Sequence, residues 1–176
     1  MRHTVEHIFD ASPARLWEVF FFDDAFVAGL YDHLGLEIAR RELQREGSGE
    51  TLIVRRKLSL ALRREFSPLL RPLLGAPVRL VERGDFSAEL RRFSVAVELP
   101  VAAARIDCGG EYTWEALPSG QTRRIWRGRC EARVPLIAAR IEASMLAEVE
   151  RALDRSYAYT RSYLRGRAAP QASARA

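Results

Sequence analysis

The sequence predicts an α+β fold in which a seven-stranded, curved antiparallel sheet wraps around a long C-terminal helix. Three features lead to this prediction: a strand followed by a capped helix at the N-terminus, a series of strands joined mostly by short turns, and a long amphipathic segment near the C-terminus. A sheet with one apolar face needs a partner to cover it, and an amphipathic helix supplies that partner.

The N-terminal elements are a strand over about residues 2–9 and two short helices over about 13–21 and 24–34. Ser12 can accept hydrogen bonds from the first helical turn, and Pro13 suits the first helical position. Asp23 or Asp24 can cap the second helix, which explains this pair of acids without a catalytic role. The apolar stripe of the first helix consists of Leu16, Trp17, Val19 and Phe20.

Six further strands fill the middle of the chain. Two glycine-containing turns, Gly47-Ser48-Gly49 and Leu117-Pro118-Ser119-Gly120, suit hairpin loops. A segment over residues 66–77 holds three prolines and four leucines, too many prolines for a long helix. The strands are expected at about residues 36–45, 50–62, 78–83, 89–99, 106–116 and 122–134.

Apolar residues recur every three or four positions near the C-terminus, which predicts one amphipathic helix over about residues 136–164. At 1.5 Å per residue this helix would be about 43 Å long, so it must cross the whole domain. The alanine, arginine and proline composition beyond Gly166 is typical of a disordered tail. We therefore expect one domain over residues 1–165 and a disordered tail over residues 166–176.

Composition fits one globular domain that does not bind nucleic acid. The chain has 176 residues, 48% of them hydrophobic, and a formal net charge of +5. Lys57 is the only lysine, and the arginines are scattered as doublets whose members point to opposite faces of a strand, so no one-sided basic patch is expected. No apolar run reaches the roughly 18 residues of a membrane span, and no signal-peptide pattern is present, so we expect a cytoplasmic protein.

The segment from Asp10 to Phe20 reads Asp-Ala-Ser-Pro-Ala-Arg-Leu-Trp-Glu-Val-Phe. Together with the order of elements, it resembles the START-like superfamily, whose helix-grip fold is shared with birch-pollen allergens and polyketide cyclase-like proteins. A second stretch, Val134-Pro135-Leu136-Ile137, resembles an uncharacterised family of unknown function within that superfamily. The resemblance covers about residues 2–164 and implies the fold, but members include lipid carriers, cyclases, hormone receptors and chaperone activators.

The last two strands predict one wall of an internal cavity. Even-numbered residues alternate with mostly charged ones in both strands, and a turn centred at Ser119 would place them opposite one another. Facing glycines leave space, and neighbouring aromatic rings suit an apolar ligand. Ile141 and Met145 of the last helix are expected to contact this ligand; alternatively, they pack into that space and leave no cavity. The inward residues are Tyr112 opposite Trp126, Gly110 opposite Gly128, and Cys108 opposite Cys130, with Trp114 beside them.

Other inward residues offer polar contacts. Arg56 points inward by strand alternation and could hold a carboxylate or phosphate head group, unless a bulge turns it outward. His7 shares a face with Val5 and Phe9, so it either reaches the cavity or belongs to the core or its rim. Cys108 and Cys130 could form a cross-strand disulfide or react with a ligand, or they could remain buried free thiols.

The proline-rich segment has two interpretations. Its leucines, flanked by arginines, could form a lid over the cavity mouth or a contact with an anionic membrane. They could equally plug one end of the core. These residues are Leu69, Leu70, Leu73 and Leu74.

We expect a non-enzymatic carrier or sensor that binds a hydrophobic small molecule or lipid in the cavity, without a cofactor. The alternatives are a cyclase- or dehydratase-like enzyme, with Tyr112, His7 or Arg56 polarising a bound ring, and a protein-interaction module. His3 and His7 lie about 13 Å apart along a strand, too far to chelate one metal ion. Because no nucleophile elbow, phosphate loop or zinc spacing is present, no catalytic or metal-ligating residue is assigned.

Overall fold

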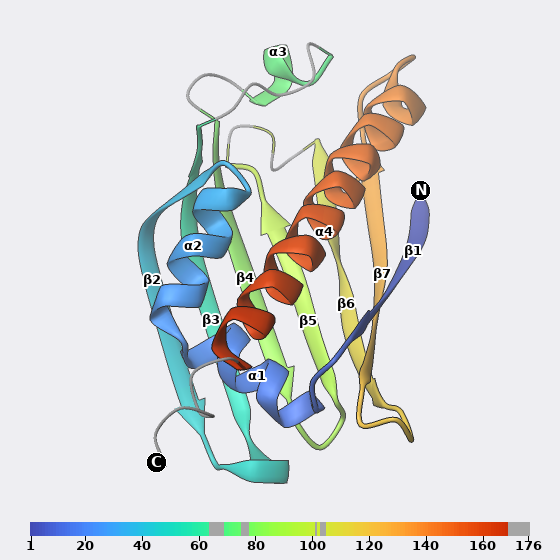
Figure 1. Cartoon of the computed structure of the whole chain (residues 1–176). Coiled ribbons are helices and arrows are strands. Elements are labelled where there is room, and N and C mark those ends of the chain that lie inside the picture. Colours follow the sequence, from blue (N-terminus) through green and yellow to red (C-terminus); the bar gives the residue numbers. More distant parts are fainter. Residues whose placement is uncertain (64–68, 75–77, 101, 103–104, 169–176) are drawn as a thin grey trace, which may run out of the picture.

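The structure is a computed structural model that describes residues 1–63, 69–74, 78–100, 102 and 105–168. One seven-stranded antiparallel sheet, in the order β1-β7-β6-β5-β4-β3-β2, curves around the C-terminal helix (Figure 1). This confirms the predicted fold class. The elements are β1 (Arg2–Phe9), α1 (Pro13–Phe22), α2 (Asp24–His33), β2 (Leu36–Glu46), η1 (Gly49–Thr51), β3 (Ile53–Leu62), α3 (Arg71–Leu74), β4 (Arg79–Ser87), β5 (Arg92–Glu98), β6 (Ile106–Ala116), β7 (Thr122–Ala132) and α4 (Ala138–Ala168).

The first two helices begin at side-chain caps. Ser12 Oγ accepts a hydrogen bond from the backbone N–H of Arg15 at 3.3 Å, at the start of α1. Asp23 Oδ1 accepts one from the N–H of Phe26 at 3.1 Å, at the start of α2. Because the free N–H groups of a first turn need acceptors, these bonds fix where each helix starts. The predicted cap at Ser12 is confirmed, and Asp23 is the cap of α2.

The hairpin formed by β6 and β7 has the predicted register. The inward residues of the two strands lie directly opposite one another, and those of β1 continue the same face. The pairs are Tyr112 with Trp126, Gly110 with Gly128, and Cys108 with Cys130.

Strand β4 is longer than predicted because Gly84 does not end it. A Cβ atom at Gly84 would lie 2.2 Å from the ring of Phe93, on the neighbouring strand. Glycine at this position therefore lets the Phe93 ring pack over the middle of β4. The strand continues to Ser87 and carries Glu82 and Phe86 on its inner face.

Helix α4 crosses the concave face of the sheet diagonally, from the end of the molecule that carries α3 toward α1 (Figure 1). It contacts β7, α2 and β1. It continues to Ala168, so it includes the first residues that were expected to belong to the tail. Residues 169–176 lie outside the described residues, and their disorder stays a prediction.

The short helix α3 closes one end of the core. Leu70 and Leu74 are buried there, in a cluster with Leu99, Ile106 and Met145. This supports the interpretation of the segment as a plug, although residues 66–68 and 75–77 lie outside the described residues. A membrane contact through Leu69, Leu70, Leu73 and Leu74 would require the two buried leucines to leave the core, and that contact stays a prediction.

Candidate functional site

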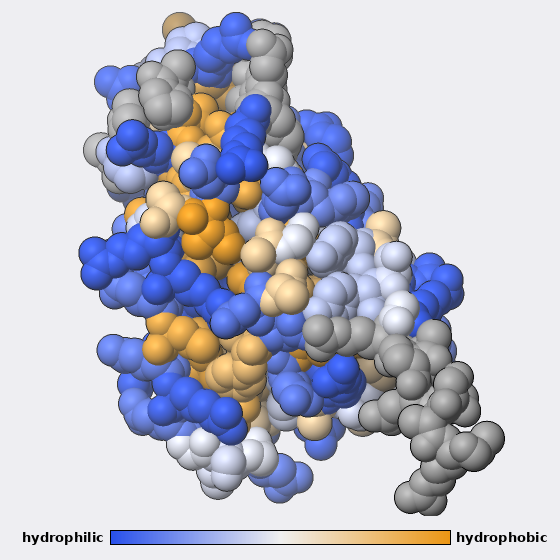
Figure 2. All heavy atoms as spheres, turned by 60° about the vertical axis from the view of Figure 1, so that its left-hand side comes forward, coloured by the Kyte–Doolittle hydropathy of each residue, from blue (hydrophilic) through white to orange (hydrophobic). Residues whose placement is uncertain are grey.

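A cavity of about 210 Å³ lies between the concave face of the sheet and α4. Apolar side chains from β3 to β7, α2 and α4 form most of its wall. Figure 2 views the molecule from the side of β2 and α2 and shows hydrophobic residues at the surface between hydrophilic ones. Several cavity-lining residues are only half-buried, so the cavity can be reached from the surface: Leu34, Leu36, Leu62, Leu80 and Val149.

Three polar side chains form a hydrogen-bonded cluster in the cavity wall. Arg56 Nη2 donates to Glu82 Oε1 at 2.6 Å. The Tyr31 hydroxyl donates to Glu82 Oε2 at 3.1 Å and accepts from Arg56 Nη2 at 3.3 Å. Arg56 is 4% exposed and the Glu82 side chain 17% exposed. The prediction that Arg56 points inward is confirmed, but Glu82 already balances the charge that was expected to hold an anionic head group.

The guanidinium of Arg56 is also held between aromatic rings. Its carbon lies 4.9 Å from the ring centroid of Phe20 and 5.2 Å from that of Phe93, which is cation–π geometry. Burial acts to lower the pKa of Arg56, but facing Tyr31 and Glu82 outweigh burial, so this pKa lies above its ordinary value. Burial also raises the pKa of Tyr31 well above its ordinary value. The cluster is therefore a fixed ion pair with a neutral tyrosine beside it.

Tyr112 and Trp126 form an adjoining part of the wall, with ring centroids 4.5 Å apart. Among the described residues, neither the Tyr112 hydroxyl nor the Trp126 indole N–H has a hydrogen-bond partner. Burial raises the pKa of Tyr112, so its hydroxyl remains a neutral hydrogen-bond donor. Both residues line the cavity, and the Trp126 Nε1 atom itself is buried over Gly128, near His3, where a polar group is costly to leave unpaired.

The space over the facing glycines is filled. A Cβ atom at Gly110 would lie 2.4 Å from Cζ2 of Trp126, and one at Gly128 would lie 2.4 Å from Cε1 of His3. The prediction that these glycines leave room for a ligand is therefore wrong. They allow the indole of Trp126 and the imidazole of His3 to pack against the strands.

Both cysteines line the cavity. Cys108 and Cys130 are free and buried, as one of the three sequence-based interpretations expected. Met145 of α4 also lines the cavity, whereas Ile141 is fully buried in the adjacent core and does not reach the cavity wall. Of the two α4 residues expected to contact a ligand, Met145 therefore lines the cavity and Ile141 does not, and the space over the glycines is occupied by Trp126 and His3 instead.

Besides Ile141 and the two facing glycines, two further residues predicted to contact a ligand lie outside the cavity wall. Trp114 packs edge-on against Phe86, with ring centroids 5.8 Å apart. His7 stacks on Tyr157 at 4.3 Å, and its Nδ1 lies 3.3 Å from Arg124 Nη2. Both side chains point inward, as predicted, but they belong to packed parts of the core.

Six polar cavity residues were not assigned to the site from the sequence: His3, Tyr31, Glu82, Arg129, Glu148 and Ser156. Glu82 lies inside the strand predicted over residues 78–83, on the same face as Phe86, but the sequence pattern did not show that this strand would place it beside Arg56. Tyr31 lies in the second predicted helix, and the sequence pattern did not show that its hydroxyl would reach Glu82 and Arg56. His3 lies opposite Gly128 in the β1–β7 ladder, a pairing that the sequence pattern did not supply.

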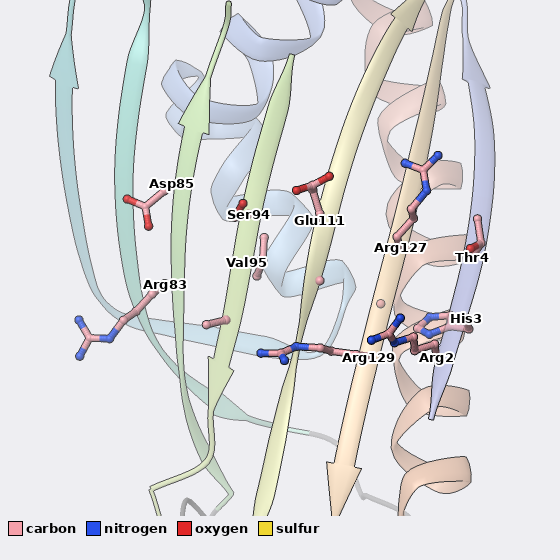
Figure 3. A pocket seen from close by; sticks show the side chains of 13 residues that line it. Arg2, His3, Thr4, Arg83, Asp85, Ser94, Val95, Glu111, Arg127 and Arg129 are labelled. Carbon is pink, nitrogen blue, oxygen red and sulfur yellow. The ribbon is translucent and has the colours of Figure 1, made fainter. Parts of the chain in front are cut away.

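A larger hollow, of about 640 Å³, lies on the outer face of the sheet (Figure 3). It is open to solvent, and two of its arginines are already paired: Arg83 Nε lies 2.6 Å from Glu98 Oε1, and Arg129 Nη2 lies 3.4 Å from Asp107 Oδ2. We assign the candidate site to the smaller cavity because it is more enclosed than this outer hollow and is lined mainly by apolar groups.

The described part of the chain has no group of three or more His, Cys, Asp or Glu side chains placed to hold a metal ion. Within the same residues, no helix is both long enough and apolar enough to cross a membrane.

Solved structures share this fold at low sequence identity. The Zhui aromatase/cyclase from Streptomyces sp. R1128 superposes with a TM-score of 0.62 at 17% identity, covering 98% of this chain and 99% of its own. TTHA0849 from Thermus thermophilus superposes with a TM-score of 0.57 at 17% identity, covering 90% of this chain and 96% of its own. No curated protein matches the sequence. The resemblance to the START-like, helix-grip fold is thereby confirmed.

A family model described as "Protein of unknown function (DUF2505)" matches residues 4–164. The match spans most of the chain, which therefore belongs to the DUF2505 family.

Proposed function

We propose that this protein binds a small, uncharged, mainly apolar molecule that carries a hydrogen-bond-accepting oxygen, and that it acts as a carrier or sensor. The observation that carries the proposal is the cavity of about 210 Å³ between the sheet and α4, with its apolar lining and few polar groups. Few, well-placed polar groups in an apolar pocket are typical of small-molecule sites.

The volume supports a ligand of limited size. An apolar protein cavity of about 150 Å³ can hold benzene, and pockets for drug-sized ligands start at about 300 Å³. A cavity of about 210 Å³ suits one substituted ring or a short chain. A two-chain lipid would have to extend through the half-buried residues at the mouth.

The lining supports an acceptor on the ligand rather than a charge. Glu82 neutralises Arg56, so an added anion would gain little and lose its hydration. The Trp126 indole N–H and the Tyr112 hydroxyl lack partners among the described residues. A carbonyl or ether oxygen would accept from one of these donors, at a net gain of about 1 kcal/mol.

A cyclase-like enzyme is the second candidate, favoured by the presence of Arg56, Glu82 and Tyr31 in the cavity wall. Such a cluster could polarise a ligand carbonyl. The similar Streptomyces structure is named as an aromatase/cyclase. Chemical conversion of a bound polyketone that stops in Arg56→Met and Tyr31→Phe would replace the carrier proposal with this one. A protein-interaction module with a vestigial cavity is a third candidate and requires an empty, inert interior.

Native mass spectrometry of the purified chain, followed by extraction, tests the proposal. We expect a copurified molecule of one-ring size, lost in Ala152→Phe, which places a ring in the cavity from α4. The matched control is Ala158→Phe, at an exposed position of the same helix, which should retain the molecule. Absence of any bound molecule, together with equal affinity of both variants for added aromatic ketones, contradicts a cavity site.

A further inference from the structure

Cys108 and Cys130 face each other across β6 and β7 in a geometry that permits a disulfide. They are direct cross-strand partners, and both line the cavity.

Backbone hydrogen bonds indicate how close the β6–β7 ladder brings the Cα atoms of Cys108 and Cys130. The N–H of Cys130 donates to the carbonyl oxygen of Met1, on the side of β1, at 3.0 Å. Arg133, three residues later, donates its N–H in the opposite direction, to Arg105 on the side of β6, at 2.6 Å. Backbone polar groups alternate in direction along a strand, so Cys108 and Cys130 are a non-hydrogen-bonded pair of the β6–β7 ladder. Such pairs have Cα atoms about 4.5 Å apart, within the roughly 4.4–6.8 Å range of disulfides.

We propose that Cys108 and Cys130 form a redox-active thiol pair, which a hydroperoxide entering the cavity converts into a cross-strand disulfide. The two thiols are 5% and 2% exposed, so the cavity is their route to solvent. A hydroperoxide of near-water size fits this route. The neighbouring ladder bonds lie on either side of the pair, so the disulfide can form without breaking them. This site does not depend on which ligand the cavity binds.

The two sulfurs have different roles. The hydrogen bond from Cys108 lowers the pKa of Cys130, and the same bond raises the pKa of Cys108 far above its ordinary value. We therefore assign the attacking thiolate to Cys130 and the resolving thiol to Cys108, and the single variants below test this assignment.

The reaction is balanced in atoms and electrons. The Cys130 thiolate attacks one peroxide oxygen, the O–O bond breaks, and Cys130 sulfenic acid and hydroxide form. Cys108 sulfur then attacks Cys130 sulfur, and the S–O bond breaks. The proton of Cys108 leaves with that hydroxyl group as water, and the first hydroxide takes up the proton that Cys130 released. Two thiols and one peroxide thus give one disulfide and two waters, with two electrons passing from sulfur to oxygen.

Intact mass after peroxide treatment tests the pair in the full chain. Reduced protein is exposed to hydrogen peroxide, freed of excess oxidant, and alkylated with N-ethylmaleimide under denaturing conditions. We expect a monomer that has lost two hydrogen atoms, takes up no maleimide, and regains both thiols with dithiothreitol. Two alkylated thiols, added oxygen atoms, or a covalent dimer would overturn the proposal.

Single variants test the assignment of roles. Cys108→Ala should stop at a sulfenic acid on Cys130 that dimedone traps, because no second thiol can displace the hydroxyl. Cys130→Ala should consume peroxide at least about tenfold more slowly, because the remaining thiol is poorly ionised. Equal rates in the two variants would contradict Cys130 as the attacking sulfur. Should either alanine variant unfold, the mass measurement on the unaltered chain still decides whether the disulfide forms.

Discussion

Arg56 and Arg124 are both buried, inward-facing arginines, each 4% exposed, yet their surroundings differ. Arg56 is paired with Glu82 at 2.6 Å and lines the cavity of about 210 Å³. Arg124 has no ion pair among the described residues, faces His7 Nδ1 at 3.3 Å, and borders a void of only about 10 Å³. Both guanidinium groups rest on aromatic rings, but only one of them adjoins space for a ligand.

The two buried arginines differ in whether the protein supplies a counter-charge. Around Arg56 the protein supplies the counter-charge, and the pKa of Arg56 is raised. Around Arg124 burial lowers the pKa, and nearby tyrosines offset this only in part. A void of about 10 Å³ holds at most one water molecule. We infer that the Arg56 cluster belongs to the ligand site and that Arg124 stiffens the packed core beside it.

Glu82→Gln should have the largest effect, because it leaves the Arg56 charge buried without its counter-charge. We expect a loss of about 3 kcal/mol in the free energy of unfolding, measured by urea denaturation. The matched control is Glu98→Gln, which removes another carboxylate 2.6 Å from an arginine, Arg83, but in an exposed pair. That control should cost less than about 1 kcal/mol. Equal losses in the two variants would show that the buried pair is not a distinct structural element.

Arg124→Met should have a smaller effect, within about 1 kcal/mol of the unaltered chain. The methionine keeps apolar contact with Phe9 and Tyr112 and removes the cost of burying an unpaired cation, while the cation–π contacts are lost. Arg123→Met, at the neighbouring position, is the control for strand propensity. A loss as large as that of Glu82→Gln would mean that Arg124 has a counter-charge of comparable strength.

Substitution of His7 should have the smallest effect, and that effect is a change in how the stability of the folded protein depends on pH. Burial and the nearby Arg124 lower the pKa of His7 below its ordinary value of 6.5, and Asp154 opposes them only partly. The unfolded chain therefore binds this proton more tightly, and the stability contributed by neutral His7 is present above about pH 6.5 and falls as the pH drops below it.

We expect the unfolding midpoint to fall less between about pH 7 and pH 5 in His7→Gln than in the unaltered chain. Thermal unfolding followed by circular dichroism measures this difference. His33→Gln, which removes an exposed imidazole at the end of α2, should keep the full acid dependence. An unchanged slope in His7→Gln would show that His7 does not titrate differently in the folded protein.

Alternation along β6 and β7 predicted the register of the final hairpin and the inward direction of Tyr112, Trp126 and both cysteines. Alternation reports direction only, so it could not separate Trp114, which packs against Phe86, from Trp126, which borders open space. Whether a ring fills the space over a glycine depends on its rotamer and on the strand pairing. No local sequence pattern encodes either property. Only the structure could therefore show that the Trp126 ring occupies the space over Gly110.

Glu82 illustrates a second limit. Glu82 lies inside the strand predicted over residues 78–83, but its role depends on Arg56, 26 positions earlier in the chain, and on the pairing of β3 with β4 that brings the two side chains together. No local sequence pattern encodes that pairing. The fold and the inward direction of Arg56 were therefore predictable from local patterns, whereas the hydrogen-bond partners of Arg56 were not.

The indole N–H resonances of the three tryptophans, followed by NMR during titration with acetophenone, test the central claim most directly. Acetophenone is a single ring with one acceptor oxygen. We expect a saturable shift of the Trp126 resonance with those of Trp17 and Trp114 unchanged, and up to about tenfold weaker binding of ethylbenzene, which lacks the oxygen. A Trp126 resonance that stays in place, or equal shifts at Trp114, would contradict a ligand site in the Arg56 cavity.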